Sequence, residues 1–197
     1  MDLLLDAFHS PLGSVAVASD GRALVALDFC SPEPMEARLR ARFGDGVAIR
    51  EARDPHGLTA RARAYFAGDL GALAAVPVDG GGTPFQQRVW AALRDIPAGE
   101  TESYSALAAR LGMPRGSRAV GFANGRNPIA IAVPCHRVVG ADGSLTGYAG
   151  GLERKRWLLA HERAALPLLA AASLATAGRR APPLAAPAAG AHAFGRR

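Results

Sequence analysis

The sequence predicts an α+β protein built from an N-terminal α/β domain and a second, mainly helical domain. Two observations lead to this prediction. Short strand-like runs alternate with helical spacing over residues 1–79, whereas helical spacing dominates residues 83–163. The glycine triplet 80–82 lies between the two patterns and indicates a linker. A chain of 197 residues, 49% of them hydrophobic, is long and apolar enough for two small packed domains.

The first domain, residues 1–79, is expected to contain a β-hairpin. Runs 13–19 and 22–27 are strand-like and are joined by Asp20-Gly21, a strong hairpin signal. The remaining elements follow from the apolar spacing and from the residues that interrupt it. They are helices over 34–43 and 58–66, a short strand over 47–49 and a last edge strand over 76–78.

The second domain, residues 83–163, opens on a well-marked helix. Thr83 is a good N-cap, Pro84 suits the first helical position, and Gln86 completes a capping box. Two more helices are expected, over 103–111 and 115–125, with the turn Gly112-Met113-Pro114 between them. This helix–turn–helix spacing is a weak signal of DNA binding by itself, because many helical hairpins share it.

Charge is distributed unevenly along the chain. Residues 1–79 carry a net charge of −3, residues 80–163 carry +5, and residues 164–197 carry four arginines and no carboxylate. A polyanionic partner is therefore expected to meet the second half of the chain. After about residue 166 the composition collapses to Ala, Leu, Pro, Gly and Arg, so residues 166–197 are predicted to be a flexible tail.

The sequence shows no pattern of membrane insertion or export. No apolar run approaches the length of a membrane span, and residues 1–6 lack both a basic segment and a long apolar stretch. The two cysteines, Cys30 and Cys135, stand in different settings and do not suggest a disulfide framework. A free thiol fits the reducing cytoplasm, where we expect the protein to reside.

The segment Pro134-Cys135-His136-Arg137 is the most informative feature of the chain. It follows the apolar run 129–133, which has the character of a buried strand. A thiol flanked by proline and histidine is unusual unless the sulfur reacts, since a nearby imidazole promotes thiolate chemistry. The alternative is a packed cysteine that acts as a small hydrophobic residue.

Motifs spread over Thr83–Glu162 favour the reactive interpretation. They are Phe85-Gln86, Val89-Trp90, Ile96-Pro97-x-Gly99-Glu100-Thr101, Ser103-Tyr104, Arg118-Ala119-Val120-Gly121, Ala123-Asn124-Gly125-x-Asn127-Pro128, Ile131-x-Val133-Pro134-Cys135-His136-Arg137-Val138-Val139, Leu145-x-Gly147-Tyr148-x-Gly150-Gly151 and Lys155-x-x-Leu158-Leu159-x-x-Glu162. With these residues the chain resembles the bacterial 6-O-alkylguanine-DNA alkyltransferases, also called methylated-DNA–protein-cysteine methyltransferases. The resemblance implies a winged-helix/helix-turn-helix catalytic domain after a ribonuclease-H-like domain, which residues 1–79 match only in element order.

The resemblance implies DNA repair by direct dealkylation. An alkyl group would pass from 6-O-methylguanine, and also from 4-O-methylthymine, to Cys135 in one irreversible turnover after nucleotide flipping. Because a free thiol with a pKa near ~8.5 is mostly protonated at neutral pH, the family uses a relay that corresponds here to Cys135, His136 and Glu162. In an extended chain neighbouring side chains point apart, so His136 would reach the sulfur through water. Glu162, otherwise an ordinary exposed helix carboxylate, would orient the imidazole and favour its protonated form.

Further roles in the pocket carry over by position in the motifs. Tyr104 is expected to donate to the purine N3, and Asn127 to tie the third helix to the reactive segment. The backbone carbonyls of Cys135 and Val138 would accept from the guanine 2-amino group, and Tyr148 would form a wall of the pocket.

DNA contacts are expected from the third helix and its surroundings. Arg118 corresponds to the family's arginine finger, which fills the gap left by the flipped nucleotide; by itself it would be a phosphate contact or a solvated residue. The small side chains of Ala119 and Ala123 suit a helix laid in the narrow minor groove. Ser103 and the backbone N–H of Ala149, which would face the 6-oxygen and stands where some members have serine, complete the predicted set.

The implied partner is double-stranded DNA with alkylated guanine, bound through its minor groove by a monomer, with no cofactor. A structural zinc is not expected, since only Cys30 with His9 or His56 could supply ligands in the first domain. Other functions remain open: a noncatalytic protein that flags alkyl lesions, against which Cys135 argues, a Cys–His hydrolase, which would leave Arg118 unexplained, and a transcriptional regulator.

Overall fold

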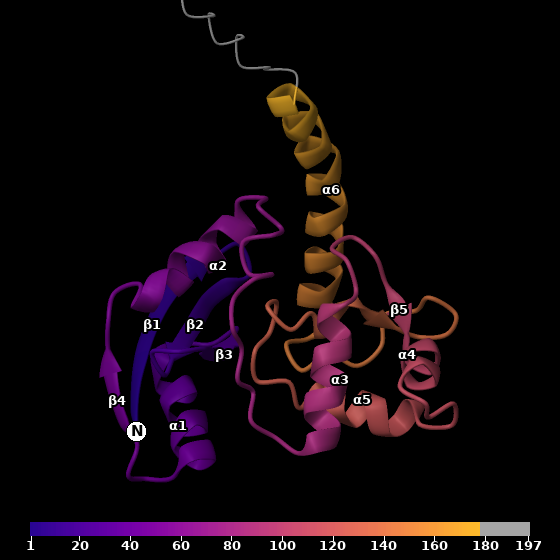
Figure 1. Cartoon of the computed structure of the whole chain (residues 1–197). Helices are drawn as coiled ribbons and strands as arrows, with labels where there is room; N and C mark the ends of the chain where they lie inside the picture. Colours follow the sequence, from indigo (N-terminus) through magenta and orange to yellow (C-terminus); the bar gives the residue numbers. More distant parts are fainter. Residues whose placement is uncertain (178–197) are drawn as a thin grey trace, which may run out of the picture.

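The computed structural model describes residues 1–177, in which an N-terminal α/β part lies beside a helical part (Figure 1). The N-terminal part is a four-stranded sheet of order β3-β2-β1-β4, made of β1 (Asp2–Ser10), β2 (Gly13–Ser19), β3 (Leu24–Asp28) and β4 (Ala48–Glu51). β4 pairs with β1 in parallel, and the other pairs are antiparallel. Helices α1 (Pro32–Phe43) and α2 (Leu58–Phe66), the latter after the 3-10 turn η1 (Pro55–Gly57), contact β1.

β1 is the strand that the sequence patterns did not predict. It is central to the sheet, because both β2 and β4 pair with it. Leu3 and Leu5 point into one hydrophobic cluster with Met35 and Leu39 of α1, whereas Phe8 points into a second cluster. This division follows from the alternation of side chains along a strand.

The predicted hairpin and helices of this part are confirmed, with small shifts in their ends. Asp20 forms the hairpin turn, since its Oδ1 accepts from the backbone N–H of Arg22 and of Ala23 at 2.8 Å each. The expected edge strand over 76–78 is wrong, because only Val78 forms an isolated bridge, with Leu24. Proline has no N–H to continue a ladder, and position 77 is a proline.

The helical part confirms the predicted order of helices. It contains α3 (Pro84–Arg94), β5 (Glu102–Ser103), α4 (Tyr104–Arg110), α5 (Ser117–Gly125), the 3-10 turn η2 (Cys135–Arg137), β6 (Val138–Val139) and α6 (Leu152–Ala177). The capping box of α3 is formed in both directions between Thr83 and Gln86. Trp90 Nε1 donates to the carbonyl of Ala123 at 2.9 Å and so ties α3 to α5.

The apolar run 129–133 is not the strand that its composition suggested. Ile129 forms only an isolated bridge with Leu27 of β3, and Ile131 has a φ of 69°. The chain then turns back, so that Val133 N donates to Ile129 O at 3.0 Å. Short apolar runs do not distinguish a strand from a buried turn by pattern alone. The start of the turn hydrogen-bonds to Leu27 of β3, where the two parts of the molecule meet.

One hydrophobic core runs through both parts. It combines Phe8, Val17, Leu27 and Tyr65 of the first part with Leu93, Val120, Ile129 and Leu158 of the second. The apolar area buried between the two parts stabilises their association, in addition to the area buried within each part.

The prediction of a flexible tail from residue 166 is wrong for residues 166–177, which continue α6. Ala and Leu are strong helix formers, and the low-complexity composition concealed this propensity. Residues 178–197, which hold the rest of the predicted tail, lie outside the described residues. Within residues 1–177, no helix is both long and apolar enough to cross a membrane.

Candidate functional site

The reactive segment lies at the junction of the two parts. Cys135 and His136 stand on η2, directly after the turn that hydrogen-bonds to β3. Cys135 is 7% exposed and His136 is fully buried. The sequence interpretation assumed an extended chain here, which is wrong: a 3-10 turn sets the relation of the two side chains.

Glu162, on α6, is the centre of a buried hydrogen-bond network. Its Oε1 lies 2.8 Å from His136 Nε2, 2.8 Å from Arg137 Nη2 and 2.8 Å from the donating hydroxyl of Tyr65. Its Oε2 accepts from the backbone N–H of Gly99 at 3.0 Å and from Arg137 Nε at 3.1 Å. Glu162 has no exposed surface, so it is not the exposed helix carboxylate that its neighbours in sequence allowed.

This network keeps the Glu162 carboxylate ionised. Burial by itself would raise its pKa, but the hydrogen bonds from His136 and Arg137 and the charge of Arg137 outweigh burial and hold the pKa well below its usual range. An ionised carboxylate only accepts hydrogen bonds, so a neutral His136 ring must carry its proton on Nε2. Nδ1 is then the basic nitrogen, and it has no hydrogen-bond partner among the residues described.

Burial also governs the ionisation of His136. It lowers the pKa of the imidazole, and the opposing effect of Glu162 does not compensate for it. Glu162 favours the protonated form, because its hydrogen bond and its charge raise the pKa of the ring, but burial lowers that pKa by more. A neutral imidazole with a free Nδ1 can accept a proton, which a protonated one cannot.

Cys135 is a thiol in the resting protein. Burial raises its pKa to about 11, although a hydrogen bond from Asn127 and the charge of Lys155 act in the opposite direction. Since an ordinary thiol has a pKa near ~8.5, this sulfur ionises only if a base removes its proton. His136, the next residue in the chain, has the unpartnered Nδ1 described above.

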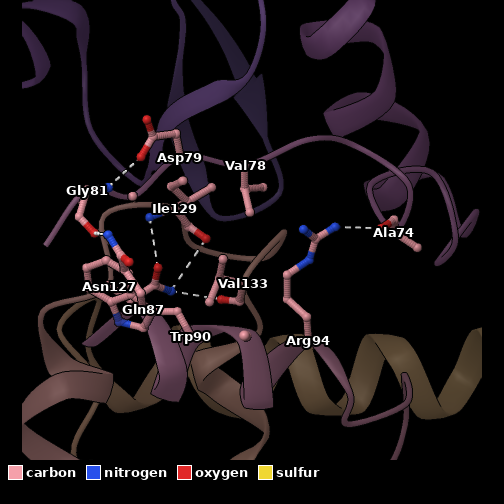
Figure 2. A pocket seen from close by; sticks show the side chains of 12 residues that line it. Ala74, Val78, Asp79, Gly81, Gln87, Trp90, Arg94, Asn127, Ile129 and Val133 are labelled. Atoms are coloured by element: carbon pink, nitrogen blue, oxygen red, sulfur yellow. Dashed lines mark hydrogen bonds between the residues drawn. The ribbon is translucent and has the colours of Figure 1, made fainter. Parts of the chain in front are cut away.

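Asn127 fixes the backbone that leads to the thiol, and Figure 2 shows its hydrogen bonds as dashed lines. Its Nδ2 donates to the carbonyl of Val133 at 2.8 Å and to that of Ile129 at 3.4 Å. Its Oδ1 accepts from the backbone N–H of Ile129 at 3.0 Å. The amide thus clamps both ends of the turn 129–133.

A cavity of about 670 Å³ lies behind this clamp (Figure 2). Ile129 and Val133 line it from the turn, Trp90 and Arg94 line it from α3, and Gly81 lines it from the linker. None of the relay residues contributes to its lining, so it is not the pocket for a base that meets the thiol.

Tyr104, the first residue of α4, is connected to the backbone of the reactive residue. Its hydroxyl donates to the carbonyl of Gly147 at 3.2 Å. Asn124 Nδ2 lies 3.4 Å from that hydroxyl and 3.3 Å from the carbonyl of Cys135. Burial raises the pKa of Tyr104, so its hydroxyl remains a proton donor.

Lys155, on α6, is a buried cation beside Tyr104. Its Nζ donates to Val138 O at 2.5 Å and to Thr146 O at 2.7 Å, and lies 5.9 Å from the centre of the Tyr104 ring. Burial lowers its pKa to about 8. The carbonyl of Val138 therefore already has one donor and keeps one lone pair for another. Tyr148 is half-buried, with a hydroxyl that has no partner among the described residues.

The outer face of α5 contains only part of the predicted DNA-contact set. Arg118 and Ala119 are exposed there. Ala123 is fully buried in the core beneath the helix. Its prediction as a groove-facing residue is wrong, because position 123 falls on the side of the helix that packs against α3.

Ser103 and Ala149 lie near the ends of two helices. The Ser103 hydroxyl accepts from the backbone N–H of Ala106 at 3.1 Å and so caps α4. Ala149 is exposed, and together with Arg126 and Asn127 it lines a cavity at the end of α5. The structure thus gives Ser103 a local role in the helix and places Ala149 beside the residues that follow α5.

Four further residues of the site were not singled out in the sequence. Asn124, Arg137 and Lys155 stand inside the motifs, where a polar residue among buried neighbours is the available signal. Tyr65 stands outside every motif, in the first domain. Its contact with Glu162 joins residues 97 positions apart, and no local pattern reports such a pairing.

Comparison with known proteins agrees with this geometry. Residues 4–79 match the family described as 6-O-methylguanine DNA methyltransferase, ribonuclease-like domain, and residues 84–164 match its DNA binding domain. The methylated-DNA–protein-cysteine methyltransferase of Salmonella typhimurium is 47% identical over 163 residues, which cover 81% of this chain and 95% of that protein. The Mycobacterium tuberculosis protein of the same name is 46% identical, covering 80% and 91%.

Solved structures show the same similarity in three dimensions. The O6-methylguanine methyltransferase of Mycobacterium tuberculosis has a TM-score of 0.67 at 42% identity, over 82% of this chain and 93% of that one. A structure of the OGT protein from the same organism in complex with DNA has a TM-score of 0.67 at 40% identity, over 84% and 94%.

Proposed function

Because this chain belongs to the methylated-DNA–protein-cysteine methyltransferases, which repair DNA by alkyl transfer to one of their own cysteines, we propose that Cys135 is the acceptor. The observation that carries this proposal is the buried pair of His136 and Glu162, which leaves a basic nitrogen on the residue next to the thiol. Cys30, the other cysteine, has no histidine next to it in the sequence, and burial and the charge of Asp28 raise the pKa of its thiol.

The proton leaves the thiol before the alkyl group arrives. It passes through a water molecule to Nδ1 of His136, and the imidazolium that forms is stabilised by the carboxylate of Glu162. The cost of charging the buried ring is offset because its counter-ion is already in place at 2.8 Å. Hydrogen bonds from Arg137 and Tyr65 keep the Glu162 carboxylate in place while the positive charge forms on His136.

The transfer itself is a single displacement. The thiolate of Cys135 attacks the alkyl carbon, the S–C bond forms as the O–C bond of 6-O-alkylguanine breaks, and the electron pair passes to the guanine. Tyr104 donates a proton to the purine N3, so that guanine leaves as a neutral base. A thioether has no comparable leaving group, and the protein is consumed after one turnover.

The damaged base reaches the thiol outside the DNA stack. The alkylated position lies inside the duplex, so the nucleotide must be flipped. The carbonyls of Cys135 and Val138 accept from the 2-amino group of guanine, Tyr148 forms a wall, and the N–H of Ala149 faces the 6-oxygen. The smaller 4-O-methylthymine meets the same sulfur but lacks that amino group.

The duplex is bound by the helical part of a monomer through the minor groove. Arg118 is exposed on α5, the position from which a side chain can fill the gap left by a flipped nucleotide. Ala119, next to it on the exposed surface, lets the helix approach the narrow groove closely.

The acceptor is tested by mass spectrometry after exposure to a duplex containing 6-O-methylguanine. Wild type and Cys30→Ala should each gain one methyl group, located on Cys135 after proteolysis, in an amount that never exceeds one per protein. Cys135→Ala should bind the duplex and gain none. A methyl group on Cys30, or several turnovers per protein, would falsify this assignment.

A further inference from the structure

An aromatic side chain is exposed on the helix that carries Arg118. Phe122 is 62% exposed, whereas its neighbours Val120 and Ala123 are buried in the core. One turn of helix separates position 118 from position 122, so both residues lie on the same face of α5. Covering a large apolar ring is favourable, so this ring can contribute to the binding of a partner.

The surroundings of Phe122 indicate what kind of partner this is. Arg115, Arg118 and Arg126 are exposed on the same helix or at its ends. No carboxylate occurs in the sequence between Glu102 and Asp142. A helix with several arginines in and beside it and no carboxylate of its own is complementary to a polyanion.

A cation lies beside the ring. The guanidinium of Arg126 lies 4.5 Å from the centre of the Phe122 ring, within the range of a cation–π interaction. The arginine carries a positive charge beside the ring. An apolar wedge with a neighbouring phosphate contact is the arrangement by which minor-groove proteins unstack a base step.

We propose that Phe122 enters the minor groove as an apolar wedge at a base step beside the flipped nucleotide, with Arg126 on the adjacent phosphate. This inference rests on the proposed function and adds to it a residue that assists extrusion without touching the thiol. In this inference the groove-facing residue of this part of α5 is the exposed Phe122 and not Ala123, whose side chain is buried.

Binding is measured in a Cys135→Ala background, with a duplex that contains 6-O-methylguanine, over a range of salt concentrations. Phe122→Ala should weaken binding roughly tenfold, the size of effect that a lost stacking contact produces. The slope of log affinity against log salt should stay unchanged, because an apolar ring releases no counterions. Arg126→Ala is the matched control, and should reduce the steepness of that slope by about 1.

Two readouts separate a wedge from other roles of the ring. A 2-aminopurine beside the lesion should fluoresce less with Phe122→Ala than with the parent, because fewer steps are unstacked, and Phe122→Leu should restore part of the signal. With Cys135 present, Phe122→Ala should react with free 6-O-benzylguanine at the wild-type rate.

Other outcomes overturn the inference. Unchanged affinity and unstacking would show that the ring does not enter the groove, and a reduced salt slope for Phe122→Ala would show that it only supports Arg126. A dimer in sedimentation that disappears with Phe122→Ala would assign the face to a second copy of the chain. If wild type itself transfers no methyl group, the proposed function fails, whatever Phe122 does.

Discussion

A carboxylate shielded from solvent, as Glu162 is, stays charged only while donors occupy its oxygens. Tyr65, His136, Arg137 and Gly99 all donate to it, so the cost of burying the charge is offset locally. Removing one member of a buried ion pair lowers the free energy of unfolding, because the other charge stays buried without a partner.

Glu162→Gln keeps the size of the side chain and removes its charge. Arg137 would then be a buried cation without a counter-ion, and we expect a loss of about 3 kcal/mol in the free energy of unfolding by urea at pH 7. The folded-state pKa of Glu162 lies below its unfolded value of about 4.3, so its contribution is present above pH 4.3 and is lost as the pH falls further.

The difference in stability between wild type and Glu162→Gln should therefore shrink below about pH 4.3. Urea titrations between pH 7 and pH 3 measure it. A difference that stays constant over this range would mean that the ionised form of Glu162 is not its source.

Single residues differed in how far the sequence could predict them. Cys135, His136 and Glu162 were predicted together from motifs, and the structure brings His136 and Glu162 into contact. The resting charge of His136 could not be predicted, because it depends on the burial of the ring more than on its partner. Tyr65 could not be predicted either, since its role comes from a contact between domains.

At the scale of elements, α5 has one face buried in the core and one face exposed. Val120 and Ala123 pack into the core, while Arg118, Ala119 and Phe122 face outward. Sequence composition alone favoured small residues as groove contacts and did not distinguish the two faces. The phase of the helix, which the tertiary contacts of α3 and α4 fix, decides which small residue is buried.

Arg118→Ala should slow repair of duplex DNA far more than reaction with free 6-O-benzylguanine. The side chain matters only when a base leaves the stack and its place is filled, a step that costs a few kcal/mol. Single-turnover rates with both substrates measure the effect. Equal losses on the two would place Arg118 in the chemistry of the thiol instead.

Elements were predictable where their signals are local. The capping box of α3 and the Asp20-Gly21 turn are examples, since each depends on a few neighbouring residues. β1 and the turn 129–133 were not, because a central strand and a buried turn acquire their form from distant partners. The C-terminal end of α6 was taken for part of the tail because its Ala-rich sequence resembles a disordered segment in composition.

At the scale of the whole molecule, the first domain contacts the proposed site directly. Its β3 hydrogen-bonds to the turn 129–133, and Tyr65 of α2 reaches Glu162 in the second domain. Trp157 and His161 of α6 stack on each other, and His161 Nε2 lies 2.8 Å from the carbonyl of Tyr65. These contacts hold α2 against α6, so the position of Glu162 depends on both domains.

Tyr65→Phe tests this dependence by removing one hydroxyl and nothing else. Burial raises the pKa of Tyr65 far above its ordinary value, so the hydroxyl is a permanent donor to Glu162. Without it the carboxylate orients His136 less well, and we expect transfer to slow roughly tenfold, as for other partners that act through a ligand or base. The factor should be the same for free 6-O-benzylguanine and for duplex DNA, because the change acts on the nucleophile.

Thr59→Val is the control. It removes a buried hydroxyl from the same helix and should react at the wild-type rate. A loss confined to duplex DNA, or an equal loss in Thr59→Val, would mean that α2 serves DNA binding or general stability and not the orientation of Glu162.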